Sequence, residues 1–161
     1  MIQQIKELRV RIDGLHQLTK DLKPLDLGIT GFNSHEIDEA AKSLILAKAW
    51  LGKLLGELGN ENPYSSGKKE IKDIESTADV AKNLTVDVDG GWEEMSHIEK
   101  VDWLRSDIQK VIDEIRIMEF DIEGTSYLDN HKSIARLNSY NHLSEARFWL
   151  GFEFQRIKED S

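Results

Sequence analysis

Apolar residues recur at spacings of three and four positions in four stretches of this chain, which is the periodicity of an amphipathic helix. The first stretch ends at Pro24, a residue that a helix interior does not tolerate. Its apolar positions are Ile2, Ile5, Leu8, Ile12, Leu15 and Leu22. We therefore predict a first helix over about residues 2–22.

A second helix is predicted after a turn that contains two glycines. Asn33 or Ser34 is a good N-cap, and Gly59 is a good C-terminal stop. The apolar stripe between them consists of Ile37, Ala41, Leu44, Leu51, Leu55 and Leu58. The short connection predicts that these first two helices form an antiparallel hairpin.

The second half of the chain shows the same arrangement. One helix is predicted from about Trp92–Ser96 to Glu123–Gly124, and a final helix from Leu128 or Asn130 to Lys158. The apolar stripe of the first of these consists of Ile98, Val101, Leu104, Ile108, Val111, Ile115 and Met118. These two helices are predicted to form a second hairpin.

The connection between the hairpins, residues 60–91, shows no helical periodicity. Asn62–Gly67 is typical of a turn, and Val86–Gly91 is compatible at most with a short extended piece. We expect an irregular but ordered crossover that packs on the helices.

The two hairpins are copies of one unit. The segment Ala47–Gly52 matches Ala146–Gly151, with a tryptophan at the same place in both. The preceding helices match at a constant offset, which pairs Ile5, Leu8, Arg9, Ile12 and Leu15 with Val101, Leu104, Arg105, Ile108 and Val111. The differences between the copies are therefore the best guide to function.

These elements predict an all-α protein, in which tandem antiparallel hairpins at 1–59 and 92–161 are joined by the crossover at 60–91. The four long helices should pack as a bundle. Because each helix carries a long apolar stripe and the chain is small, we expect a dimer or larger homo-oligomer, held mainly by residues 98–118 and 137–154. The alternative is an intramolecular four-helix bundle that buries all four stripes by itself.

The last helix differs from its copy along one face. Three apolar positions, Ile37, Ala41 and Ile45, become Arg136, Tyr140 and Ser144. With Ser133 and Arg147 these form a polar stripe, because all five lie within about a quarter of the helical wheel. Apolar residues that we expect to be buried flank the stripe, with Leu143, Leu150 and Phe154 on one side and Leu137, Phe148 and Phe152 on the other. A polar stripe between buried flanks predicts a pocket or a wet interface.

The stripe has side chains that suit a phosphate-bearing ligand. Guanidiniums bind phosphate through paired hydrogen bonds, and a tyrosine ring stacks on a base. Bases also recur in the two copies, since Lys48 matches Arg147 and Arg9 matches Arg105. The candidate ligand-binding residues are Ser133, Arg136, Tyr140, Ser144, Arg147, Arg105, Lys48 and Arg9.

The alternative for the same residues is a structural network in which the arginines pair with acidic neighbours. If the stripe is a ligand site, replacing it by the first copy's residues should leave stability unchanged or raise it, because like charges on adjacent turns repel.

The composition excludes several other kinds of site and partner. The 161 residues carry a net charge of −9, so a field that attracts duplex nucleic acid is absent. The chain has no cysteine, and no apolar run approaches the roughly 20 residues of a membrane span. A catalytic triad, a glycine-rich phosphate loop and a metal-ligand set are absent, and Asp87-x-Asp89-Gly90 lacks the remaining ligands of a calcium loop. We expect a soluble, cytoplasmic protein that is not an enzyme and uses no metal or cofactor.

The segment Lys132–Gly151 resembles the closing helix of small helical-hairpin proteins of bacteriophages, the sponges that counter the CBASS and Thoeris defence systems. The resemblance lies in a base followed by Ser-x-Ala and then Leu-x-x-Ala before an aromatic stretch with tryptophan, as in Leu143–Trp149. Leu44–Trp50 fits the same frame. The resemblance implies sequestration of an immune signal in the host cytoplasm, without cleavage, in pockets between subunits or hairpins. The implied signal is a cyclic oligonucleotide or an ADP-ribose derivative. Two fused hairpins depart from the family's single hairpin.

Two other functions stay open. An all-α nucleotide pyrophosphohydrolase would hold magnesium with several helical acidic pairs, of which Glu36-x-x-Glu39 is one, but the second helix of that pattern is not convincing. An acidic protein that blocks a host factor by surface mimicry is the other.

Overall fold

The computed structural model describes residues 2–22, 35–59, 77–85, 91–118 and 134–160, and it contains no strand in these ranges. The elements are α1 (Ile2–Lys20), α2 (His35–Glu57), α3 (Thr77–Leu84), the short 3-10 helix η1 (Trp92–Glu94), α4 (His97–Ile117) and α6 (Ile134–Asp160). The prediction of an all-α fold with four main helices packed as a bundle is confirmed.

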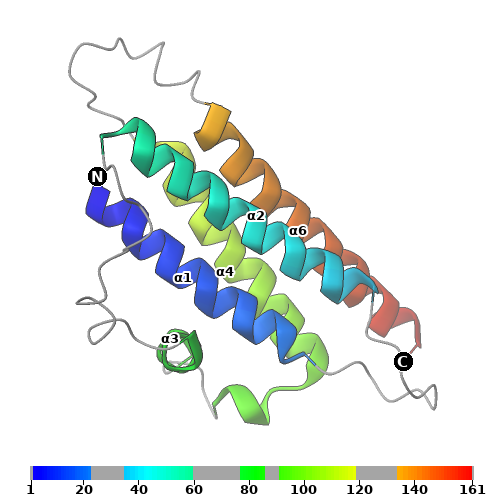
Figure 1. Cartoon of the computed structure of the whole chain (residues 1–161). Helices are drawn as coiled ribbons and strands as arrows, with labels where there is room; N and C mark the ends of the chain where they lie inside the picture. The colour runs from blue at the N-terminus through cyan, green and yellow to red at the C-terminus, as the bar shows by residue number, and fades with distance from the viewer. Residues whose placement is uncertain (1, 23–34, 60–76, 86–90, 119–133, 161) are drawn as a thin grey trace.

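The four long helices lie side by side, and α1, α2, α6 and α4 follow one another around the bundle (Figure 1). The helices of each such pair run in opposite directions, including α1 against α4 and α2 against α6. Because α4 begins at the same end of the bundle as α2, the chain returns along the bundle between the two hairpins. None of the described helices combines the length and the apolar character that crossing a membrane requires.

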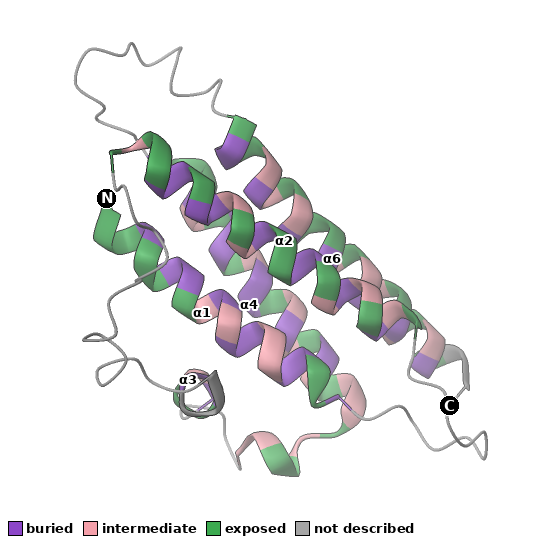
Figure 2. Ribbon diagram, viewed as in Figure 1, coloured by how far each residue is buried: buried purple, intermediate pink, exposed green. Residues whose placement is uncertain are grey.

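The core is formed by the four predicted stripes facing one another (Figure 2). The largest fully buried side chains are Ile5, Ile12, Leu15, Leu44, Leu51, Leu54, Leu55, Leu104, Ile108, Ile115, Leu143 and Leu150. One chain therefore buries its own stripes, as the alternative of an intramolecular bundle predicted. This removes the excess of apolar surface from which we expected an oligomer. The homo-oligomer itself stays a prediction.

The internal repeat is visible in the packing. Equivalent positions are buried alike, as for Leu8 and Leu104, Ile12 and Ile108, Leu44 and Leu143, Ala47 and Ala146, and Leu51 and Leu150. Since α1 lies antiparallel to its copy α4, and α2 to its copy α6, an approximate two-fold axis across the bundle relates the two hairpins. The α1–α2 pair is therefore equivalent to the α4–α6 pair, whereas the α1–α4 and α2–α6 pairs each lie on the axis.

One predicted helix boundary was wrong. Helix α4 starts as expected, with a capping box between Ser96 and Glu99, but it ends at Ile117, because Met118 is extended. The end predicted at residues 123–124 was therefore too late. The predicted start of the last helix, at residues 128–130, lies outside the described residues.

The crossover contains a helix that the sequence pattern did not predict. Helix α3 packs on α1, with Val80 and Ala81 buried and Gly14 directly beneath it. Its apolar positions span little more than one turn, too short a pattern to show a period. The predicted packing of the crossover on the helices holds for this segment, whereas residues 60–76 and 86–90 lie outside the described residues.

Candidate functional site

The polar stripe of α6 lies along the edge of that helix that faces α4. Near one end, Arg136 reaches the last turn of α4, and further along Gly151 lies against the guanidinium of Arg105, to which a Cβ on Gly151 would come within 3.4 Å. Tyr140 and Arg147 lie between these points at helical spacing and so share the same edge. We call the arginines of this edge, Arg105, Arg116, Arg136 and Arg147, the arginine seam.

Arg116 belongs to this seam, although the sequence analysis did not single it out. It follows Arg105 by three helical turns on α4, so both project from the same face. The spacing of Arg105 and Arg116 can be read from the sequence. The sequence pattern does not show which face of α4 meets α6, so the spacing alone could not place Arg116 at this site.

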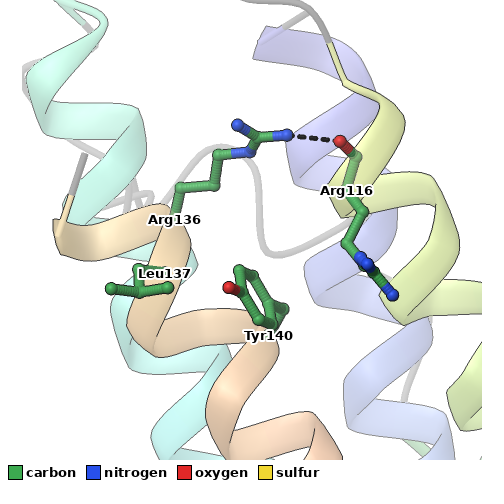
Figure 3. Close-up of a pocket in the computed structure, with 4 residues that line it drawn as sticks. All are labelled: Arg116, Arg136, Leu137 and Tyr140. Atoms are coloured by element: carbon green, nitrogen blue, oxygen red, sulfur yellow. Dashed lines mark hydrogen bonds between the residues drawn. The ribbon is translucent and has the colours of Figure 1, made fainter. Parts of the chain in front are cut away.

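Arg136 is held by α4 and has a structural role. Its Nε donates to the carbonyl oxygen of Ile115 at 3.1 Å, and its Nη2 donates to the carbonyl oxygen of Arg116 (Figure 3). The last carbonyls of a helix lack donors from their own helix. The side chain of Arg136 thus caps α4 across the hairpin, which explains why a guanidinium is buried there.

A small hollow opens beside this cap. It has a volume of about 170 Å³ and is lined by Arg116, Arg136, Leu137 and Tyr140, with Tyr140 pointing from α6 toward α4 (Figure 3). Pockets that enclose a drug-sized ligand hold roughly 300–1,000 Å³. The hollow can take one phosphate group or a few waters, and a larger ligand would have to extend along the open seam.

Arg105 and Arg147 lie closer to the middle of the seam, and their charge is less well matched. The Nε atom of each is buried and has no hydrogen-bond partner among the described residues. Arg105 lies over the ring of Phe154 at 5.9 Å and against Gly151, which is one turn beyond Arg147. Arg105 and Arg147 thus lie along the same α4–α6 edge, and no described carboxylate is ion-paired with either.

The other predicted site residues lie elsewhere or act locally. Ser144 is exposed, and its hydroxyl donates to the carbonyl oxygen of Tyr140 at 2.9 Å. Lys48 and Arg9 lie on the first hairpin, where Lys48 pairs with Asp13 across 2.8 Å. Ser133 lies outside the described residues. The structure thus gathers Arg136, Tyr140, Arg147 and Arg105 and places the first copy's bases apart from them.

One predicted flank of the stripe was wrong. Leu143 and Leu150 are buried as expected, but the opposite flank faces solvent, with Leu137 43%, Phe148 60% and Phe152 48% exposed. The two helices packed against α6, α2 and α4, cover only its inner half, and these residues lie on its outer half. The rings of Phe148 and Phe152 contact each other edge to face, with centroids 4.7 Å apart, and both contact Trp149, whose ring lies against His35 of α2. These rings therefore form an exposed aromatic patch on the outer face of α6, and Leu137 is the residue of this flank that lines the hollow beside Arg136.

A second charged cluster, which the sequence analysis missed, lies at the other end of α6. Glu153 replaces the buried Leu54 of the first copy and is itself fully buried. It accepts from Arg156 at 2.6 Å and contacts His97 Nε2 at 3.1 Å. The three groups bind one another, so they form a closed structural cluster. Among the described residues, no three potential metal ligands are placed to hold an ion.

Comparisons with known proteins add no further information. No family model, no curated protein and no solved structure matches this chain. The structural arguments for function therefore come from the seam itself.

Proposed function

We propose that this protein binds a phosphate-bearing ligand of the nucleotide class along the arginine seam and sequesters it without cleaving it. The observation that carries the proposal is the pair Arg105 and Arg147, whose buried Nε atoms have no hydrogen-bond partner among the described residues. A buried donor without an acceptor destabilises a fold by about 1–3 kcal/mol. An anionic ligand would supply the missing acceptors and balance two neighbouring positive charges.

The chemistry of the seam favours binding over catalysis. It presents guanidiniums and the phenol of Tyr140, which hold and orient a phosphate or stack on a base. The exposed rings of Phe148 and Phe152 lie on the outer face of the same helix and offer a further apolar surface. These groups stabilise a bound anion, but they include no paired base and nucleophile that would activate water for attack on it.

The resemblance of Lys132–Gly151 to the phage sponges extends the proposal to a biological role. On that basis the ligand is an immune second messenger, either a cyclic oligonucleotide or an ADP-ribose derivative, and the protein acts in the host cytoplasm against a defence system. The small enclosed volume beside Arg136 requires the ligand to lie in an open groove. A homo-oligomer would cover that groove, and light scattering that shows only about 18.5 kDa would exclude one.

Native mass spectrometry tests the proposal directly. The protein is co-expressed with an active signal-producing enzyme, and the mass of any bound small molecule is read together with the oligomeric state. We expect one messenger per seam, released chemically intact on heat denaturation. Recovery of a hydrolysed product would place the protein among the pyrophosphohydrolases, and co-purification of a host protein with no small molecule would favour surface mimicry.

A matched pair of variants locates the site. Arg147→Gln should weaken binding by roughly a hundredfold, because about 2–3 kcal/mol of charge-assisted hydrogen bonding is lost. Lys48→Gln changes the equivalent base of the first hairpin, which is already paired with Asp13, and should leave messenger binding unchanged. Equal effects of the two variants would contradict a site at the α4–α6 seam.

A further inference from the structure

The two hairpins carry a basic residue at the same place but surround it differently. In the first hairpin, Lys48 of α2 reaches across to α1, where its Nζ lies 2.8 Å from Oδ2 of Asp13. In the second hairpin the equivalent base is Arg147. The position equivalent to Asp13 is Gln109, and its register is fixed by the buried pair Ile12 and Ile108 immediately before it.

Gln109 cannot replace Asp13 as a counter-charge. Its side chain is neutral, and its amide Nε2 donates to Asp113 Oδ1 at 2.9 Å, within α4 itself. No ion pair of Arg147 occurs within the described part of the chain, and its Nε is buried without an acceptor there. One exchange between the copies, an acid for an amide, therefore leaves Lys48 ion-paired in one hairpin and Arg147 without an ion pair among the described residues in the other.

We propose that Asp13 occupies, in the first hairpin, the place that the phosphate of the ligand takes in the second. This inference rests on the proposed function. A carboxylate oxygen at 2.8 Å from an ammonium has the distance of a charge-assisted hydrogen bond, as a phosphate oxygen would. The chain thus carries two copies of the same anion site. The copy in the second hairpin is open, and in the first hairpin the carboxylate of Asp13 takes the place of the ligand.

The surroundings of Asp13 fit this assignment. Lys48 and Asp13 are 34% and 29% exposed, so the place is accessible from solvent once the carboxylate is removed. Lys20 and Lys48 also act on the nearby His16, whose pKa is lowered by burial and by these two positive charges, against the opposing effect of Asp13. Without the carboxylate, Lys48 would lose its ion pair, and the first hairpin would carry an uncompensated base at the position of Arg147.

The ligand group that fits both copies is compact and carries more than one negative charge, such as a phosphate monoester or a diphosphate. Inorganic pyrophosphate is therefore a suitable probe, and isothermal titration calorimetry at low ionic strength measures both its affinity and its stoichiometry. The full chain is compared with Asp13→Gln, Gln109→Asp and the double variant. These substitutions copy each hairpin's residue into the other, and thermal melts followed by circular dichroism verify the fold.

We expect wild type to bind one pyrophosphate and Asp13→Gln to bind two. Gln109→Asp should weaken binding at the α4–α6 seam by roughly a hundredfold, since the new carboxylate competes for Arg147. The double variant should bind one pyrophosphate through the first hairpin, and adding Lys48→Gln should abolish that binding. Asp13→Asn, which keeps the shape of the side chain, should behave as Asp13→Gln does.

Failure of this inference differs from failure of the proposed function. If wild type binds one pyrophosphate and Gln109→Asp loses it, but both variants of Asp13 still bind one, Asp13 fills no equivalent site and this inference alone is overturned. If wild type binds none, or if Gln109→Asp binds as wild type does, the arginine seam is not an anion site and both proposals are overturned.

Discussion

Arg11 and Asp107 occupy equivalent positions of the two repeats and bind each other. Nη2 of Arg11 lies 2.8 Å from Oδ1 of Asp107, and its Nε donates to Oδ2 at 3.3 Å, between residues that are 96 positions apart. The offset is the same as that between Leu8 and Leu104, so the pair lies at the approximate two-fold axis between α1 and α4. Residues on such an axis face their own copies, and identical arginines would repel each other. Because the second repeat has Asp107 where the first has Arg11, the two side chains attract each other instead.

Reversing either charge of this pair should destabilise the bundle. Arg11→Asp and Asp107→Arg each place like charges together at a site where Arg11 is 23% and Asp107 9% exposed. We expect each to lower the free energy of unfolding by about 2–3 kcal/mol, below the 3–5 kcal/mol typical of fully buried pairs. The double reversal should recover only part of the loss, because Arg11→Asp also replaces the ion pair with Glu114, at 3.3 Å, by two like charges. Urea denaturation of all four proteins gives the coupling energy, and additive losses would show that the two residues do not interact.

Helix α3 should depend on the absence of a side chain at Gly14. A Cβ there would lie 2.7 Å from Leu84 Cδ1 and 2.8 Å from Val80 Cγ1, so these side chains, or α3 with them, must shift. We expect Gly14→Ala to lower stability by about 1 kcal/mol, since overpacking outweighs the gain in helix propensity, and to increase amide exchange in α3.

Gly56 is the matched control for this substitution. It lies in α2, and a Cβ there would meet nothing within 4 Å. Gly56→Ala should therefore raise stability by about 0.5–1 kcal/mol through helix propensity alone. If both alanine variants raise stability equally, the close packing of α3 on α1 is not a constraint.

Arg136 and Arg147 should respond differently to removal. Arg136→Ile, which copies Ile37, leaves the carbonyls of Ile115 and Arg116 without this donor and should lower stability by about 1–3 kcal/mol. This reverses the expectation from the sequence that removing the stripe is neutral or stabilising. For Arg147→Leu that expectation stands, and stability should stay unchanged or rise, because the variant removes a buried donor that has no acceptor among the described residues. Denaturant melts compare the two, and equal losses would assign Arg147 a structural role as well.

His16 should make the protein less stable in mild acid. Burial and the charge of Lys20 lower its pKa, and Lys48 adds to this, while Asp13 opposes it. Between this lowered pKa and the ordinary histidine value of about 6.5, the unfolded chain binds more protons than the folded one, so the free energy of unfolding falls as the pH decreases. His16→Gln should remove that part of the loss. Melting temperatures measured from pH 7 to pH 5 check this, and identical slopes for wild type and variant would contradict it.

The periodicity of apolar residues was sufficient to predict the four helices and their hairpins. A helical stripe is a local property, because a period of 3.6 residues fixes which side chains share a face whatever lies opposite. The repeat added that the hairpins are equivalent, and their equal burial at Leu44 and Leu143 follows from that equivalence. Short helices cannot be predicted in this way. Helix α3 was missed because its apolar residues span about one turn, which is too short to show a period.

The tertiary structure decided what each side chain of the stripe meets. The helical wheel placed Arg136 and Arg147 on one face of α6, but only the end of α4 at Ile117 brings free carbonyls within reach of Arg136. In the same way, only the number of neighbours around α6 leaves Phe148 exposed while Leu150 is buried. The sequence of a helix sets the angular position of each of its side chains around the helix axis. The residues that each side chain contacts depend on where the neighbouring helices begin, end and cross.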